Sequence, residues 1–325
     1  MALHTTATVL SALISLSRLF SQASAYAIDH SCVPYIGDGQ DKTTMITNGM
    51  TAANQMLTHA ASVVAGGQGV DNARNQLFAG ATAADLQTVS SRANRSSSHS
   101  AARFQYAADH TPWGITNLQG LVADQVTIYC GGENFAPDVN AGPNAWTDLT
   151  SFITVFGLAH NNAPNAEFCS VAGLGATLDS SSNVDPSSPT EYRIIVLCPG
   201  ALEKGVSPES TGSVASIQAL ANIQGLAGIY PGKTVDNVVY ATCVASVLLH
   251  ELMHVTQSAL FFRGGAEAYG WADSVTTANN GFALSNIDNY AFYATAISLP
   301  PDYFTFNGII GSTPKWNAGQ YAFAP

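Results

Sequence analysis

One apolar stretch constrains this chain more than any other part of the sequence. Between Ala241 and Phe262 the residues are mostly aliphatic, aromatic or small, and none is charged apart from Glu251 and the titratable imidazoles of His250 and His254. A run of this length and composition predicts a long, buried helix. A buried helix must satisfy its polar side chains, because burying them without partners costs free energy. A metal ion held by these side chains would do so.

The spacing of the two histidines indicates which metal chemistry is present. His250 and His254 are four positions apart, which places both imidazoles on one helix face, one turn from each other. The pattern His-Glu-x-x-His on a helix is typical of zinc proteases, in which the two histidines share one zinc ion. Glu251 is not needed as a ligand. We therefore expect one zinc ion, with Glu251 as the general base that takes a proton from an activated water.

A third protein ligand is required, because catalytic zinc sites use three and keep the fourth position for water. No histidine follows His254, so the ligand is a downstream carboxylate unless an upstream histidine reaches the metal. The downstream acids are Glu267, Asp273, Asp288 and Asp302. The upstream histidines have no supporting spacing and are expected at surface or hydrogen-bonded core positions: His30, His59, His99, His110 and His160.

Three motifs in succession resemble a known family. His250–His254 is followed by Gly-Gly-Ala-Glu-Ala-Tyr-Gly at Gly264–Gly270 and by Asn-Ile-Asp-Asn-Tyr-Ala-Phe-Tyr at Asn286–Tyr293. This order is similar to the deuterolysin and peptidyl-Lys metalloendopeptidase family, the aspzincins, of secreted fungal proteases. The resemblance implies an α+β fold, a zincin-like metalloprotease domain that is mostly helical with a small antiparallel sheet. It also implies that Tyr192–Leu197 is an edge strand that pairs with an extended substrate.

The family motifs assign site residues by position. The family's zinc-binding Asp falls on Ala266, which cannot bind metal, so the resemblance points to the neighbouring Glu267 as third ligand, with Asp273 and Asp288 as alternatives. Tyr269 matches the tyrosine that stabilises the oxyanion. Asp288 matches one acid of a lysine-binding pocket, but Ala291 stands where the second acid would be. Asp288 is therefore interpreted either as a substrate-pocket residue or as a buried acid that holds the active-site helix.

The N-terminus predicts export from the cell. An apolar run at Ala7–Leu16 is followed by small residues at Ala23 and Ala25, which fits a signal peptide of residues 1–25. Residues 26–325 are then one secreted domain, with an N-terminal helical part at about 40–95 and a zinc-site part at about 190–300. No later segment reaches the roughly 18 apolar residues that a membrane span needs.

Hydrophobic periodicity and turn residues predict the main elements of this domain. The expected helices are Ile46–Val64, Ala83–Arg92, Ala241–Phe262 and Asn286–Leu299, the expected strands are Val126–Cys130 and Tyr192–Cys198, and the expected loops are Ser96–Ser100 and Asp179–Pro189.

The cysteines fit an oxidising compartment. Cys32, Cys130, Cys169, Cys198 and Cys243 form no Cys-x-x-Cys pair, so disulfides are expected rather than a cysteine zinc site. Spacing leaves their connectivity open. The family resemblance implies a Cys169–Cys198 bridge, because the family's Cys-Pro cysteine is tied in this way, and we pair Cys32 with Cys130, which leaves Cys243 as a thiol. Asn94, in Asn-Arg-Ser, is a candidate glycosylation site.

Charge excludes some partners. Acidic residues outnumber basic ones 22 to 11, and the basic residues are scattered. Neither nucleic acid nor an anionic membrane is an expected partner, because binding to phosphates needs clustered cations. Protein or peptide substrates and a monomeric state are expected instead. The alternative to a protease is a non-catalytic secreted zinc-binding protein on the same fold, which the altered third-ligand motif favours and the intact Glu251 opposes.

Overall fold

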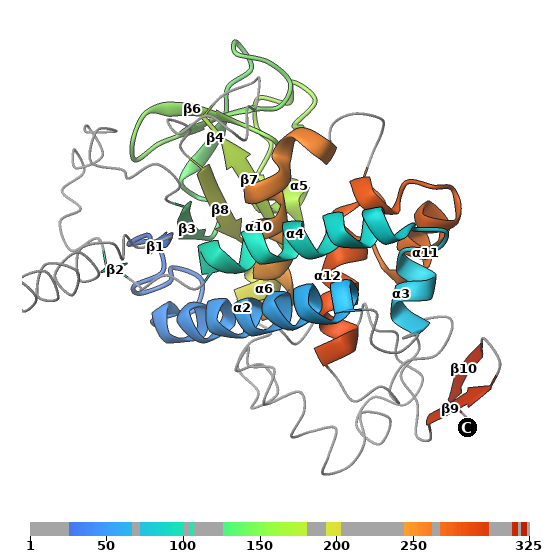
Figure 1. Cartoon of the computed structure of the whole chain (residues 1–325). Coiled ribbons are helices and arrows are strands. Elements are labelled where there is room, and N and C mark those ends of the chain that lie inside the picture. Colours follow the sequence, from blue (N-terminus) through green and yellow to red (C-terminus); the bar gives the residue numbers. More distant parts are fainter. Residues whose placement is uncertain are drawn as a thin grey trace, which may run out of the picture.

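The computed structural model combines one mixed sheet with a layer of helices (Figure 1). It describes residues 26–66, 72–100, 105–106, 126–180, 193–202, 244–261, 267–298, 314–317 and 320–323. The predicted signal peptide and Cys243 lie outside these residues, as does most of the predicted loop at 179–189. None of the described helices has the length and apolar character needed to span a membrane.

Two long helices form the N-terminal part. α2 spans Thr43–Gly66 and α4 spans Ala83–Ser100, with the short α3 at Asn72–Leu77 between them. The spacing of apolar residues predicted α2 correctly, since its periodic residues from Ile46 to Val64 are buried. α4 begins with a capping box in which the Thr82 N–H donates to Asp85 and the Asp85 N–H donates to the Thr82 hydroxyl, at 2.8 and 3.2 Å.

The polar loop predicted at Ser96–Ser100 is wrong, because α4 continues to Ser100. Serine has only a modestly lower helix propensity than alanine, by about 0.5 kcal/mol. Extending a helix that already packs against α2 avoids the cost of nucleation. The backbone of Asn94 therefore lies within a helix, and glycosylation at this position stays a prediction.

The large sheet has eight strands in the order β2-β1-β3-β8-β7-β6-β5-β4. Their bounds are Tyr26–Ile28 (β1), Gln105–Tyr106 (β2), Val126–Cys130 (β3), Phe135–Pro137 (β4), Ala145–Asp148 (β5), Ile153–Phe156 (β6), Gly175–Asp179 (β7) and Arg193–Leu197 (β8). A separate antiparallel hairpin joins β9 (Pro314–Asn317) to β10 (Gln320–Phe323).

The expected small antiparallel sheet differs from the observed one. β1, β2, β3 and β8 are parallel neighbours, and only the β8-β7-β6-β5-β4 half is antiparallel. The reason lies in the connection from β1 to β3, which passes through the helical part of the chain. Parallel strands need such a long crossover, whereas a tight hairpin would have made them antiparallel. The fold is thus a mixture of helices and a mixed sheet.

The interpretation of Tyr192–Leu197 as a substrate-pairing edge strand is wrong. β8 lies inside the sheet, parallel to β3 on one side and antiparallel to β7 on the other. All five of its residues are buried. A continuous apolar run is the pattern of a strand covered on both faces and paired at both edges, and β8 has that pattern.

Alternating residues of β8 divide the core into two layers. Ile195 and Leu197 belong to the cluster that contains the helices, while Ile194 and Val196 belong to a second cluster on the other face. The helical cluster joins α2 and α4 to the later helices, so the two predicted parts of the domain share one core.

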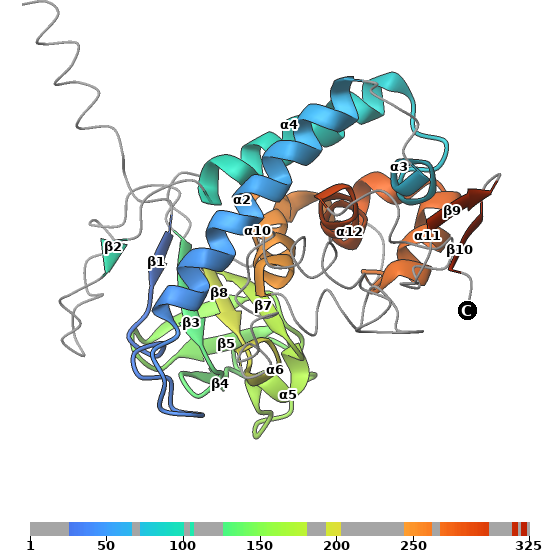
Figure 2. The same cartoon turned by 90° about the horizontal axis from the view of Figure 1, so that it is seen from below.

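The remaining helices of the described residues follow the first strands of the antiparallel half of the sheet. They are α5 (Phe168–Ala172), α6 (Pro199–Leu202), α10 (Val244–Phe261), α11 (Trp271–Asn279), the 3₁₀ helix η4 (Ala283–Ser285) and α12 (Ile287–Ser298). α10 lies between the sheet and α12 and also packs on α2 (Figure 2). The helices predicted at Ala241–Phe262 and Asn286–Leu299 are confirmed as α10 and α12.

The two predicted disulfides are confirmed. Cys32, just after β1, is bonded to Cys130 at the end of β3, and Cys169 of α5 is bonded to Cys198 after β8. The bridges span 98 and 29 positions of sequence. Both therefore restrict the unfolded chain through sizeable loops.

Candidate metal centre

α10 places two imidazoles side by side on one face. His250 and His254 are one turn apart, and their Nε2 atoms are 3.2 Å from each other. The aliphatic residues around them, including Leu249 and Leu252, are fully buried and anchor α10 in the core. The helical periodicity of this segment therefore determines the positions of both nitrogens.

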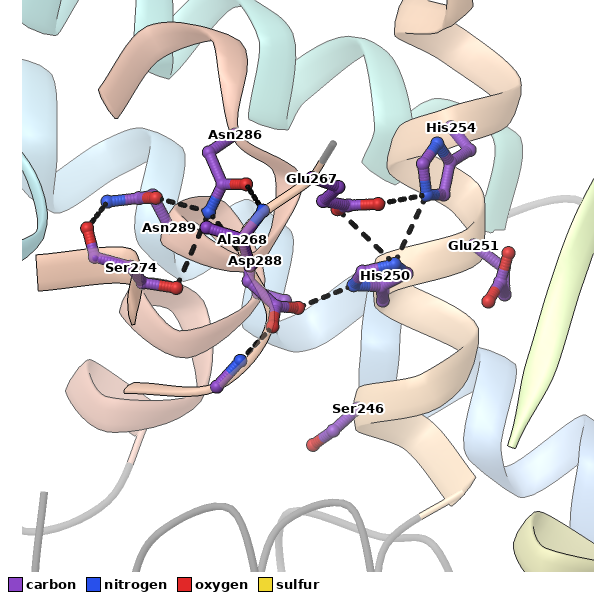
Figure 3. A network of polar contacts seen from close by, with 12 residues as sticks. Ser246, His250, Glu251, His254, Glu267, Ala268, Ser274, Asn286, Asp288 and Asn289 are labelled. Atoms are coloured by element: carbon purple, nitrogen blue, oxygen red, sulfur yellow. Dashed lines mark hydrogen bonds and ion pairs between the residues drawn. The ribbon is translucent and has the colours of Figure 1, made fainter. Parts of the chain in front are cut away.

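Glu267 supplies the third group from the segment that precedes α11. Its Oε2 lies 3.2 Å from His254 Nε2, and its Oε1 lies 3.6 Å from His250 Nε2 (Figure 3). The carboxylate side chain is only 9% exposed, and Oε1 has no hydrogen-bond partner. A buried carboxylate oxygen without a donor calls for a cation, since an uncompensated buried charge is costly.

The donor set fits a tetrahedral metal. Zinc–nitrogen and zinc–oxygen bonds of about 2.0–2.2 Å imply separations of roughly 3.3–3.5 Å between ligands in a tetrahedron. The two Nε2 atoms are 3.2 Å apart, and each faces a different oxygen of Glu267, His254 at 3.2 Å and His250 at 3.6 Å, close to these separations. These three residues form the metal-binding group found among the described residues. They can hold one metal ion, and the fourth corner of the tetrahedron receives no protein ligand from this group.

When no metal is bound, the charges of the neighbouring groups shift the pKa values of His250 and Glu267. Burial alone would lower the pKa of His250, but the carboxylates of Glu267 and Asp288 raise it to about 10. Burial likewise opposes ionisation of Glu267, yet the two histidines lower its pKa to about 2. The metal-free site therefore holds an imidazolium opposite a carboxylate, and metal binding displaces the proton.

Asp288 lies on the other side of His250. It is 1% exposed, its Oδ1 accepts a 2.7 Å hydrogen bond from His250 Nδ1, and its Oδ2 accepts one from the Gly270 N–H at 2.7 Å. A carboxylate bonded to Nδ1 fixes the tautomer and ring orientation in which Nε2 can bind a metal. These contacts favour the second interpretation of Asp288, a buried acid that holds the active-site helix.

Glu251 points away from Asp288, toward the sheet (Figure 3). The Thr177 hydroxyl of β7 lies 2.8 Å from Glu251 Oε2 and donates to it. Glu251 is 4% exposed and is not a member of the three-residue metal-binding group. It is thus a buried carboxylate that directly follows a metal ligand in sequence and contacts β7.

Tyr269 stacks on His250, with ring centroids 6.0 Å apart and an angle of 25° between the planes. The residue is 64% exposed. Desolvation of its hydroxyl, together with the negative charge of Glu267, raises the pKa of Tyr269 above its ordinary value. The phenol therefore keeps its proton and acts as a hydrogen-bond donor, with Glu267 as a partner in the metal-free site.

The other candidate ligands are placed elsewhere. Asp273 is exposed on α11, and Asp302 lies outside the described residues. His30 and His59 are exposed, and His160 is a buried core residue whose Nε2 lies 2.8 Å from the Ala145 carbonyl oxygen. The placement of His110 and of the His99 side chain is outside the described part.

Sequence reasoning assigned no role to Thr177 or Asn286, although both contact site segments. Thr177 bonds to Glu251, and Asn286 bonds to the backbone of Ala268, next to Glu267. Thr177 follows no recognisable motif. Asn286 had one usable signal, its place at the head of the third family-like motif.

Neither the comparison with protein-family models nor the comparison with curated proteins gives a match for this chain. The site geometry and the motifs therefore carry the functional argument.

Proposed function

We propose that the chain is a secreted zinc-dependent endopeptidase that hydrolyses peptide bonds, related to the aspzincins. One observation carries the proposal: two helical imidazoles and a buried carboxylate converge on one point, while a second carboxylate, Glu251, stands beside them without joining the group. A site that only stores metal gains nothing from this extra carboxylate.

The donor set supports zinc. Two imidazoles and one carboxylate are the ligands of several catalytic zinc sites, and the remaining position is kept for water or substrate. When bound, zinc supplies Lewis acidity that activates water and polarises a peptide carbonyl. His250, His254 and Glu267 would hold it, with Asp288 fixing the orientation of His250.

Three further residues of the chain contribute to the reaction. Glu251 accepts the proton of the attacking water and delivers it to the leaving amine. Thr177 orients the Glu251 carboxylate through its 2.8 Å hydrogen bond. Tyr269 donates its hydroxyl proton in a hydrogen bond to the oxyanion that develops on the substrate carbonyl.

The two disulfides and the predicted signal peptide support secretion. The substrates are proteins or peptides, and the chain acts as a monomer. The lysine-pocket role of Asp288 is not part of the proposal, because His250 and Gly270 occupy both of its carboxylate oxygens.

Proteolysis with a matched control tests the proposal. Purified protein should cleave denatured casein, and a zinc chelator should stop cleavage, with activity returning when zinc is restored. Glu251→Gln should keep zinc and lose cleavage. A protein that binds one zinc but cleaves neither casein nor a peptide library would instead be the non-catalytic zinc-binding protein.

A further inference from the structure

The segment that carries Glu267 is held by a single side-chain amide. Asn286, just before α12, accepts a 2.9 Å hydrogen bond from the Ala268 N–H and donates one of 3.0 Å to the Ala268 carbonyl oxygen. Both polar groups of one peptide residue are thus bound by one side chain, in the manner of a β-bridge. Ala268 is the residue directly after Glu267.

Few side chains can make this pair of contacts. A neutral amide has an acceptor oxygen and a donor nitrogen on one rigid planar group, whereas a carboxylate only accepts. Because the Ala268 N–H can only donate, the Asn286 oxygen must face it and the nitrogen must face the carbonyl. The contact therefore determines the orientation of the Asn286 amide.

Buried neighbours hold that amide in place. Asn286 is 3% exposed, and its nitrogen also lies 2.6 Å from the Asn289 side-chain oxygen. Asn289 is fully buried and donates in turn to the carbonyl oxygens of Leu77 and Ser274. The network connects α3, α11 and α12 to the Glu267 segment, as Figure 3 shows for its central part.

The same turn of chain holds the other side of the site. Asp288, two residues after Asn286, binds the Gly270 N–H and His250 Nδ1. These contacts fix the backbone at residues 268 and 270, on either side of Tyr269. Asp288, in the first turn of α12, also fixes the imidazole of His250. Glu267 and His250 are positioned by one rigid unit, although they come from different segments.

We propose that Asn286 is a positioning residue for the third metal ligand: its amide holds the Ala268 peptide so that the Glu267 carboxylate faces His250 and His254 before metal arrives. This inference rests on the proposed function in so far as zinc is the metal. It concerns preorganisation, since a ligand that is already in place loses little conformational freedom on binding.

Zinc affinity measured in two variants tests this role. Asn286→Asp keeps the shape of the side chain but replaces the donor by an acceptor that faces the Ala268 carbonyl, and Asn286→Ala removes both contacts. Loss of a group that orients a ligand typically weakens metal affinity by about 10- to 100-fold. We expect zinc dissociation constants, measured by competition with a chromophoric chelator, to rise by this factor in both variants.

A matched control separates positioning from general stability. Ser90→Ala removes another buried side-chain-to-backbone hydrogen bond, the 2.7 Å contact with the Ala61 carbonyl between α4 and α2, which involves neither a metal ligand nor the Glu267 segment. It should lower the melting temperature of the metal-free protein but leave zinc affinity unchanged. Cobalt, followed by its d–d absorption, should likewise bind more weakly to the Asn286 variants and bind the Ser90 variant like the unmutated protein.

Hydrogen exchange in the unmutated protein keeps the proposal testable if the variants do not fold. The Ala268 amide should exchange slowly in metal-free protein, because the Asn286 oxygen already accepts its hydrogen bond. Fast exchange that becomes slow only with zinc would overturn the proposal, as would wild-type zinc affinity in Asn286→Asp. If the wild-type protein itself binds no zinc, the proposed function fails first.

Discussion

Removing the Glu267 carboxylate should weaken zinc binding strongly, because none of the other carboxylates that the structure describes lies in position to replace it. Glu267→Ala leaves His250 and His254 as the only protein ligands of the group. Asp288 cannot replace the lost carboxylate, because its oxygens are bonded to His250 and Gly270. Asp273 is exposed on α11 and is not a member of the group. The site therefore keeps two ligands, with no substitute among the described residues.

The expected magnitude follows from zinc sites in general. Four-ligand structural sites have apparent binding free energies of about 10–16 kcal/mol, which is on average about 2.5–4 kcal/mol per ligand. At about 1.4 kcal/mol per tenfold change, the zinc dissociation constant should rise by roughly 10²–10³-fold. The burial of Glu267 favours the upper part of this range, since water screens the carboxylate poorly.

Competition titrations with a chromophoric zinc chelator measure this change, and Asp273→Ala is the matched control. It removes an exposed acid from the same part of the chain and should bind zinc like the unmutated protein. Unchanged affinity in Glu267→Ala would refute the assignment of the third ligand, while the two-histidine metalloprotease interpretation would survive. Weakened affinity in Asp273→Ala would refute the placement of that residue outside the site.

Three further predictions concern catalysis and pH. Glu251→Gln should reduce turnover by about 10²–10⁴-fold with one zinc still bound, and retained proteolysis would reject Glu251 as the base. Tyr269→Phe should lower kcat with little change in KM, because its hydrogen bond forms mainly in the transition state, and a change confined to KM would contradict this. In metal-free protein, His250 (pKa raised from 6.5 to about 10) contributes stability that is complete below pH 6.5 and is lost as the pH rises toward 10. Glu267 (pKa lowered from 4.5 to about 2) contributes stability that is complete above pH 4.5 and is lost as the pH falls toward 2. Thermal unfolding should therefore show these contributions at their maximum between pH 4.5 and 6.5, and an identical profile in Glu267→Ala would exclude this origin.

The ligand-bearing helix could be predicted because its information is local. A spacing of four residues on a helix brings His250 and His254 together whatever surrounds them, and the apolar sequence around them requires a buried helix. Glu267 could be predicted as the third ligand for a related reason. It follows His254 closely in sequence, next to the position of the family's zinc-binding Asp, and Tyr269 matches the tyrosine of the same motif. Both do lie against His250.

The sheet could not be predicted in the same way. Whether β8 lies at an edge depends on its neighbours, β3 and β7. β3 lies far from β8 in sequence, and the two strands pair with Val126 opposite Arg193. The apolar run Ile194–Leu197 of β8 indicates an interior strand, whereas the family resemblance implies an edge strand. A run of residues buried on both faces indicates an interior position more directly than a resemblance to a family does.

The residues that restrain the site are the hardest to recognise from sequence, for a physical reason. Thr177 and Asn286 are neutral, and Asn286 acts on backbone atoms, which every residue possesses. Such a contact leaves no complementary partner side chain in the sequence and no charge pattern. Metal ligands can be recognised in a sequence by residue type and spacing, whereas the groups that hold the ligands can be recognised only in the folded structure. Asn286 holds a peptide next to the ligand rather than the ligand itself, so altering it should change how firmly the metal is held without changing which atoms hold it.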